Sequence, residues 1–98
     1  MFAQIIDART SGSVEELQTL EDGWVQATEG RRTIRRSLFL QDRADPSHVL
    51  IVAFFDDADA AKRNSDLPET DALAQTMMAK AIGEPTFTDF DVKAERTY

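Results

Sequence analysis

The sequence of 98 residues contains no cysteine and only one histidine, His48. The lack of cysteine excludes disulfide bonds, thiolate metal ligands and cysteine nucleophiles. Long apolar runs are also lacking, because the longest covers residues 49–55 and a membrane-spanning helix needs about 20 apolar residues. No basic segment followed by an apolar stretch stands at the N-terminus, so we expect a cytoplasmic protein with no membrane partner.

Positive charge is scarce, since 11 Lys and Arg residues stand against 18 Asp and Glu residues, for a net charge of −7. Nucleic-acid binding needs a basic stripe, so we expect no nucleic-acid partner. The one basic cluster consists of Arg31, Arg32, Arg35 and Arg36. We interpret it as the start of a strand whose arginines balance nearby acids, because runs of charge usually form solvated faces.

Apolar patterning predicts four strands, at residues 2–9, 33–41, 48–55 and 86–92. The turn residues Asp45 and Pro46 predict a hairpin between the second strand and the third. The third strand barely alternates, because Leu50, Val52 and Phe54 fall on one face while Val49, Ile51, Ala53 and Phe55 fall on the other. This strand is therefore apolar on both faces.

A helix is predicted between the first and second strands. Ser13 is its expected N-cap, with Glu16 three residues later completing a capping box. Gly30 is expected to end it, because glycine adopts the left-handed conformation at low cost. Gly23 lies within this helix, where we expect it to weaken the helix and to let it approach the sheet closely beside Trp24.

A second helical region is predicted over residues 57–82. The acidic residues 56–59 suit its N-terminus, where negative charge meets the positive end of the helix dipole. We expect a break at Asn64-Ser65 and a new start capped by Asp66, three residues before Glu69. Gly83 and Pro85 are expected to end the region.

The predicted order is β-α-β-β-α-β in a single domain over residues 1–98, which is the ferredoxin-like α+β arrangement with a four-stranded antiparallel sheet. Both helices cover one face of such a sheet and leave the other bare. A monomer would then have strands that are apolar on one face only. Because the third strand is apolar on both faces, we expect a homodimer in which two sheets face each other.

The chain resembles the dimeric α/β-barrel superfamily, and within it the antibiotic-biosynthesis-monooxygenase-like domains. The resemblance covers residues 2–92 and depends on the element order, on Trp24 late in the first helix and on three segments. These are Val52-Ala53-Phe54-Phe55-Asp56, the helix break Asn64-Ser65-Asp66-Leu67-Pro68-Glu69, and the start of the last strand at Pro85-Thr86-Phe87.

The resemblance implies that two sheets form a barrel and that a pocket lies between each sheet and its own helices. Such proteins include cofactor-independent oxygenases of polycyclic phenols, haem-degrading enzymes, haem-dependent peroxidases and isomerases, so the fold alone does not decide the function. Iron in such a pocket is commonly held by a histidine of the second helix. Residues 57–82 contain none, so we expect no haem. The acid pair Asp56-Asp57 could bind a hard cation but more simply caps a helix, and we expect no other cofactor or metal ion.

A cofactor-independent oxygenase needs an apolar pocket that holds a phenol, favours its anion and excludes water. Trp24, Phe39, Phe55 and Met77 are candidates for the walls, Arg36 and Asn64 for a polar contact, and His48 for a base or ligand. Each also has a structural interpretation. Trp24 and Met77 would belong to the helix-to-sheet core, Arg36 to an edge strand or a dimer salt bridge, Asn64 to the helix break, and His48 to a strand end.

Two functions remain open. The first is a cofactor-independent monooxygenase that acts on a small aromatic or phenolic molecule. The second is a non-catalytic dimer that binds a small hydrophobic or aromatic ligand or has a structural role. Other functions lack their motifs, because the sequence has no nucleophile elbow, no glycine-rich phosphate loop, no paired-histidine helix and no calcium loop. Residues 49–55 also lack the aromatic pattern of an RNA-binding sheet.

Overall fold

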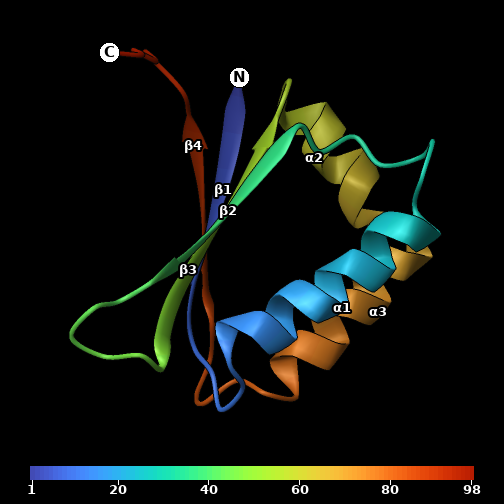
Figure 1. Ribbon diagram of the computed structural model, residues 1–98. Helices are drawn as coiled ribbons and strands as arrows, with labels where there is room; N and C mark the ends of the chain where they lie inside the picture. Colours follow the sequence, from blue (N-terminus) through green and yellow to red (C-terminus); the bar gives the residue numbers. More distant parts are fainter.

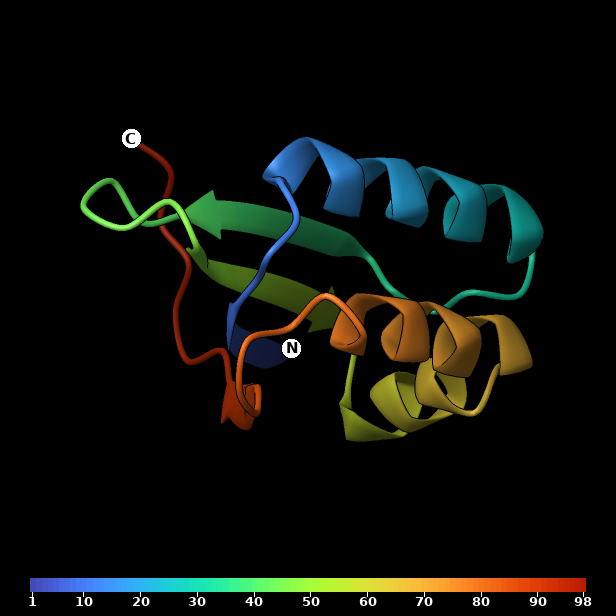
Figure 2. The same cartoon turned by 90° about the horizontal axis from the view of Figure 1, so that it is seen from below.

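The computed structural model describes all 98 residues and has a four-stranded antiparallel sheet with its helices on one face (Figures 1 and 2). The elements are β1 (Phe2–Arg9), α1 (Val14–Ala27), β2 (Arg36–Gln41), β3 (His48–Phe55), α2 (Ala58–Ser65), α3 (Pro68–Met78) and β4 (Thr86–Asp91). The strand order is β2-β3-β1-β4, so β1 and β3 are central. The predicted ferredoxin-like α+β fold is confirmed. No helix combines the length and the hydrophobicity that a membrane-spanning segment needs.

The register of the sheet determines which side chains face the helices. Phe55 of β3 pairs with Phe2 of β1, and it packs with Ala60 of α2 in the buried core. Successive residues of a strand point to opposite faces. The odd-numbered residues of β3 therefore face the helices, whereas the even-numbered Leu50, Val52 and Phe54 face away. The sequence pattern predicts these two sets but not which of them faces the helices.

The ends of α1 follow the predicted local chemistry in part. Ser13 accepts a hydrogen bond from the Glu16 N–H at 3.1 Å, so the N-cap is confirmed. The second half of the capping box does not form, because the Glu16 carboxylate lies 3.3 Å from the Lys80 ammonium instead. Thr28 caps the C-terminus by donating its hydroxyl to the Trp24 carbonyl at 2.7 Å, and Gly30 follows with φ +79.

Gly23 does not bring α1 close to the sheet, so that expectation is wrong. The residue is exposed, and no atom lies within 4 Å of the position that a Cβ would occupy. Gly23 lines a shallow groove between α1 and α3 on the outer side of the helices. It therefore weakens the helix without a compensating contact.

The second helical region starts as predicted but restarts differently. Asp57 accepts a hydrogen bond from the Ala60 N–H at 2.7 Å and caps α2. Leu67 occupies the N-cap position of α3 without a side-chain hydrogen bond, so the predicted cap at Asp66 is wrong. The Asp66 carboxylate instead accepts a hydrogen bond from Lys62 at 2.9 Å. Pro68 lies in the first turn of α3, where its missing N–H costs nothing.

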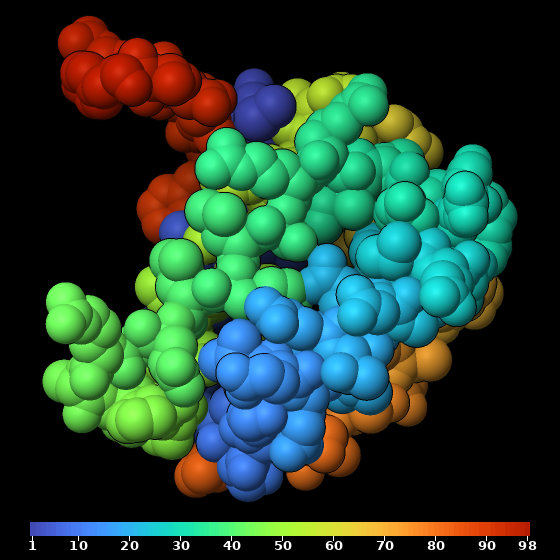
Figure 3. All heavy atoms as spheres, viewed as in Figure 1, coloured from blue at the N-terminus to red at the C-terminus, as the bar shows by residue number.

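Three further predicted boundaries differ, two of them because tertiary contacts replace regular structure. β2 starts at Arg36 rather than at residue 33, since the Thr33 N–H donates to Asn64 Oδ1 at 3.2 Å instead of to the sheet. α3 ends at Met78 rather than near Gly83, because the chain after it forms a β-bridge between Ala81 and Thr10. β4 ends one residue earlier than predicted, and the residues after it project from the body of the molecule (Figure 3).

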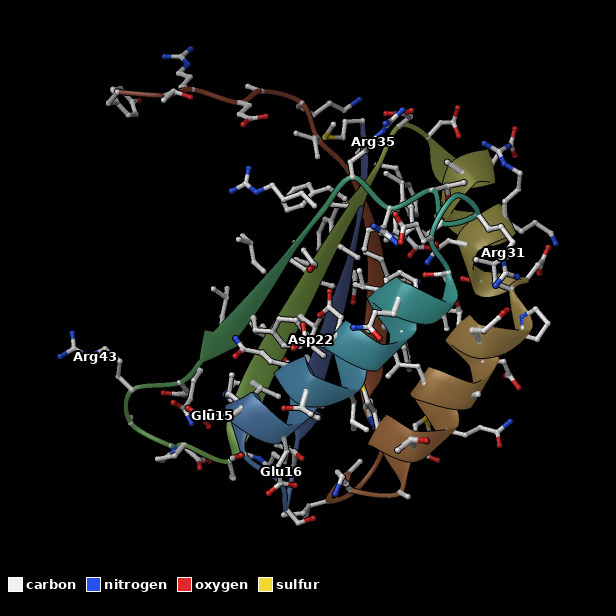
Figure 4. All side chains as sticks on the ribbon, turned by 45° about the vertical axis from the view of Figure 1, so that its right-hand side comes forward. Glu15, Glu16, Asp22, Arg31, Arg35 and Arg43 are labelled. Carbon is white, nitrogen blue, oxygen red and sulfur yellow. The ribbon has the colours of Figure 1, made fainter.

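Three of the four arginines of the cluster pair with acids as predicted, but only Arg36 belongs to the start of a strand. Arg31 forms a bidentate ion pair with Glu69, with both hydrogen bonds 2.9 Å long. Arg35 pairs with Asp56 at 2.7 Å, and Arg36 lies 3.7 Å from Glu95. Arg32 donates to the Val25 carbonyl at 2.8 Å. In Figure 4, Arg31 lies beyond the end of α1 and Arg35 lies near the start of β2, so the cluster is spread over the surface.

Candidate functional site

An apolar cavity of about 80 Å³ lies between the sheet and the helices. Its walls come from β1, α1, β3, α3 and the chain that joins α3 to β4. The lining residues are Ile6, Ala8, Arg9, Thr10, Leu17, Val49, Ile51, Ala74, Met77, Met78, Ala81, Pro85 and Phe87. Ten of these thirteen are hydrophobic, so the cavity suits an apolar molecule.

The cavity exists because small residues lie where larger side chains would fill the layer. Ala8 on β1 pairs with Val49 on β3, and Ala74 and Ala81 contribute from the helix side. One end is closed by the bridge between Thr10 and Ala81 and by the Ile82 N–H, which donates to the Arg9 carbonyl at 2.8 Å. The closure is held by backbone hydrogen bonds, so it is fixed independently of side-chain motion.

The opposite side of the cavity is open to solvent. Met78 is 50% exposed and Phe87 is 54% exposed, although both line the cavity. Phe87 belongs to β4, the edge strand that the helices leave uncovered. Met77 and Met78 are unbranched and adaptable, so this rim can change shape around a bound molecule.

Of the seven candidate site residues, Met77 lines this cavity. Phe39 lies on the helix-facing side of β2 and pairs with Ile51, which is a lining residue. Phe55 is buried at the other end of the sheet, where its ring centroid lies 6.3 Å from that of Phe2. The structure therefore places Phe39 beside the cavity and Phe55 in the core away from it.

Trp24 and Asn64 are buried residues with structural hydrogen bonds. Trp24 Nε1 donates to Thr70 Oγ1 at 2.9 Å and so connects α1 with α3. Asn64 Oδ1 accepts the Thr33 N–H and so connects α2 with the chain before β2. Neither contact was predicted from the sequence, and neither residue lines the apolar cavity.

Arg36 and His48 lie on the opposite face of the sheet, away from the helices. The Arg36 guanidinium lies 5.2 Å from the centroid of the Phe54 ring, which is a cation–π contact. His48 lies at the start of β3 with one ring nitrogen 2.9 Å from Asp42 and the other 2.8 Å from Asp7. No group of histidine and acidic side chains is arranged to hold a metal ion.

The bare face of the sheet carries a continuous set of apolar side chains. Strand register assigns Ile5, Leu38, Leu40, Leu50, Val52, Phe54 and Phe90 to it. Leu40 is 44% exposed and Phe90 is 47% exposed, so the two edges of this set are open to water. We name these seven residues the sheet-face patch.

Several solved structures share this fold over nearly their whole length. One is the crystal structure of an antibiotic biosynthesis monooxygenase, with a TM-score of 0.75 and 16% identity, covering 96% of this chain and 100% of that chain. Another is SnoaB from Streptomyces nogalater, a cofactor-independent oxygenase, with a TM-score of 0.77 and 15% identity over 96% of this chain and 94% of that one. The chain has the fold of the antibiotic-biosynthesis-monooxygenase-like domains.

Rv0793 from Mycobacterium tuberculosis has the same fold, with a TM-score of 0.75 and 11% identity over 98% of both chains. No family model matches the sequence, and no curated protein does. Identities this low carry the fold alone, so chemistry must be argued from the residues of this chain.

Sequence reasoning missed most of the cavity lining and one acidic residue of the same layer. Alanines such as Ala8 and Ala81 carry no sequence signal for a cavity, because the space depends on what faces them. Glu21 could have been found, since it lies between Leu17 and Trp24 at helical spacing on an otherwise buried side of α1. Burial raises the pKa of the Glu21 carboxyl, Ser37 lowers it by a hydrogen bond, and the charge of Asp22 raises it.

Proposed function

We propose that this protein is a cofactor-independent oxygenase that acts on a small aromatic or phenolic molecule bound between the sheet and the helices. The observation that carries the proposal is the apolar cavity, in a fold that the chain shares with SnoaB, a cofactor-independent oxygenase. Apolar walls favour an aromatic ring and keep water away from a reactive anion.

The size of the cavity supports a one-ring molecule. Its volume is about 80 Å³, whereas a closed apolar cavity that binds benzene has about 150 Å³. A single ring therefore fits when Met77 or Met78 changes its side-chain conformation at the open rim. A polycyclic molecule requires the several hundred Å³ that are typical of larger ligand sites.

Oxygen uptake tests the reaction. Hydroquinones and anthrones of increasing size are incubated with the protein in an oxygen electrode, beside samples without protein because such compounds oxidise slowly by themselves. We expect uptake above the protein-free rate, with one-ring compounds preferred over larger ones. Uptake equal to the protein-free rate for every compound contradicts an oxygenase.

One observation favours the alternative, a binding protein without turnover. Arg9 is the one charged residue that lines the cavity, and its guanidinium is paired with Asp45. The other polar side chain of the lining, Thr10, does not take up protons at neutral pH. A rise in melting temperature with a one-ring compound, without oxygen uptake, would favour this alternative.

We also propose that a second copy of the chain covers the sheet-face patch, which gives a homodimer. Exposed apolar patches of several hundred Å² usually mark interfaces. Covering such a patch stabilises an assembly by roughly 25 cal/mol per Å² before the costs of association. The support is the exposure of the patch edges at Leu40 and Phe90.

Sedimentation velocity at micromolar concentration tests the dimer. We expect a dimer for the natural sequence and an 11.0 kDa monomer for Leu50→Lys, because the variant places a charge within the patch. Gln18→Lys on the exposed side of α1 adds the same charge elsewhere and is expected to stay dimeric. An 11.0 kDa species for the natural sequence would contradict the dimer.

A further inference from the structure

The apolar cavity has an inner end and an outer end. Leu17 and Val49 line it and are buried, whereas Met78 on α3 and Phe87 on β4 line it and are about half exposed. A molecule that enters between α3 and β4 therefore has one end away from water and the other end at the solvent.

Strand register makes the floor of the cavity continuous from this mouth to the interior. Phe87 pairs with Ile6, and Ile6 pairs with Ile51 of β3. All three residues line the cavity from the sheet side, and Met77 lines it from α3. The walls along this path are hydrocarbon and thioether groups, so they offer a ligand no hydrogen bond of ordinary strength.

The polar side chains of the lining already have partners within the protein. The Thr10 hydroxyl accepts a hydrogen bond from the Gly12 N–H at 3.1 Å and lies 3.4 Å from the Lys80 carbonyl oxygen. The Arg9 guanidinium pairs with Asp45. No buried side-chain nitrogen or oxygen atom of the protein lacks a hydrogen bond. A ligand hydroxyl at the inner end would therefore stay without a partner, whereas an alkyl group would lose nothing.

The volume of the cavity limits the size of the group that fills it. An apolar cavity that binds benzene, with its six carbon atoms, has about 150 Å³. The cavity of this protein has about 80 Å³, which in proportion corresponds to about three carbon atoms. A chain of this length fits the cavity as it stands, whereas a whole ring needs the rim to change shape.

We propose that the cavity holds a short alkyl group in the para position of a phenol, so that the protein selects para-alkylphenols with chains of about three carbon atoms. This inference rests on the proposed binding of an aromatic molecule between the sheet and the helices. The hydroxyl group lies opposite the alkyl group on the ring, so it points out of the mouth, where water is available as a partner. The ring then lies at the rim, where the Phe87 ring and the Met78 thioether make favourable contacts with an aromatic ring.

A series of para-alkylphenols measures the depth of the cavity. Ligand-observed NMR titration with the full chain gives the dissociation constants of phenol and of its methyl, ethyl, propyl, butyl and pentyl derivatives. We expect each carbon atom up to propyl to tighten binding about fourfold, because each buried methylene group leaves water. Beyond propyl we expect no further gain, since the cavity is then full. Binding to an open apolar surface would instead keep tightening with every added carbon.

The polar control for para-propylphenol is para-hydroxyethylphenol, in which a hydroxyl group replaces the terminal methyl group at nearly the same size. This hydroxyl reaches the inner end of the cavity, where it has no partner. We expect binding to be at least about tenfold weaker than for para-propylphenol. Both comparisons use the natural sequence, so they do not depend on the folding of a variant.

Ile51→Val and Ile5→Val locate the alkyl chain. Both substitutions remove one carbon atom from a central strand, but Ile51 lines the cavity and Ile5 lies on the opposite face of the sheet. In Ile51→Val we expect the longest chain that still gains affinity to change from propyl to butyl. In Ile5→Val it should remain propyl.

The outcomes separate the inference from the proposed function. Equal affinities for phenol and para-propylphenol, or a gain that continues through pentyl, overturn the inference, while oxygen uptake still decides the proposed function. Equal affinities for para-propylphenol and para-hydroxyethylphenol overturn the inference as well, and so does a change of chain length in Ile5→Val but not in Ile51→Val. The absence of saturable binding for every compound overturns the proposed function and the inference together.

Discussion

The Nδ1 atom of His48 lies 2.9 Å from Oδ2 of Asp42. The other ring nitrogen, Nε2, lies 2.8 Å from Asp7 Oδ1. A neutral imidazole has one N–H and donates to one acceptor, so two carboxylate partners require the protonated ring. The hydrogen bond to Asp42 and, after it, the one to Asp7 raise the pKa of His48 above 6.5. The two carboxylates therefore favour the protonated form of His48 at the end of the sheet-face patch.

The titration of His48 can be followed without ambiguity, because it is the only histidine. We expect an NMR titration of its ring protons to have a midpoint above 6.5. Because the pKa of His48 is higher in the folded state than in the unfolded one, the protonated ring stabilises the fold. This contribution is fully present below the unfolded pKa of about 6.5 and is lost as the pH rises through the folded pKa. Urea unfolding at a series of pH values checks this direction.

Two variants test the cause of the His48 shift. Asp42→Asn should lower the midpoint more than Asp7→Asn, because Asp42 has the larger effect on the pKa of His48. Both variants should also flatten the decrease in stability above neutral pH. A midpoint at or below 6.5 in the natural sequence would contradict the pairing.

Gly23→Ala should stabilise the protein by about 0.5–1 kcal/mol, since alanine is the better helix former and restricts the unfolded chain. No atom lies within 4 Å of the new Cβ, so the substitution meets no steric cost. Urea denaturation gives the free energy of unfolding.

Gly30→Ala is the matched control for Gly23→Ala. Its φ of +79 is a conformation that residues with a Cβ rarely adopt. We expect it to destabilise the protein by about 1–2 kcal/mol. If both substitutions change stability in the same direction, the helical position assigned to Gly23 is wrong.

Sequence patterns predicted the parts of the fold that depend on local chemistry. The bounds of β1 and β3, the N-cap at Ser13 and the acidic N-terminus of α2 all agree with the structure. The start of β2 was missed because Thr33 bonds to Asn64, a residue far away in the chain. The start of α3 was missed because a neighbouring lysine takes the carboxylate of Asp66.

The candidate site was harder to predict than the fold, because residue type does not fix the face of the sheet. Phe39 and Arg36 both lie on β2, yet the first faces the helices and the second faces away. The cavity itself comes from small residues such as Ala8, whose effect depends on the side chains across the layer. The sequence therefore indicates an apolar layer without showing where it is unfilled.

The hydrogen bond from Trp24 on α1 to Thr70 on α3 is expected to stabilise the fold. Thr70→Val removes the acceptor of the Trp24 N–H while keeping the shape of the side chain. An unpaired, largely buried donor costs about 1–3 kcal/mol, so we expect a loss of stability in this range. Thr76→Val on the exposed side of α3 is the control and should change stability by less than about 0.5 kcal/mol.

The fluorescence of Trp24, the only tryptophan, reports the unfolding of both variants. If Thr70→Val and Thr76→Val have equal stability, the hydrogen bond between the helices contributes nothing. A loss of stability confined to Thr70→Val supports a role for Trp24 in joining α1 to α3.

Filling the cavity should abolish ligand binding. Ala8 faces the helices from β1 and lines the cavity, whose volume is about 80 Å³. The side chain of a leucine at this position would fill much of that volume. Extra carbon atoms in a packed layer cost about 1–3 kcal/mol where the surroundings cannot adjust, so the stability of the free protein is measured first. We then expect the rise in melting temperature with phenol to disappear in Ala8→Leu.

Ala72→Leu is the control for Ala8→Leu, since Ala72 lines the outer groove between α1 and α3 and is exposed. It adds the same carbon atoms outside the cavity and should keep the ligand-induced shift of the natural sequence. If the ligand-induced rise in melting temperature is lost in Ala72→Leu but kept in Ala8→Leu, the ring binds in the groove beside Trp24 and not in the cavity. Because the two alanines lie on opposite sides of the helix layer, the pair decides which side holds the ligand.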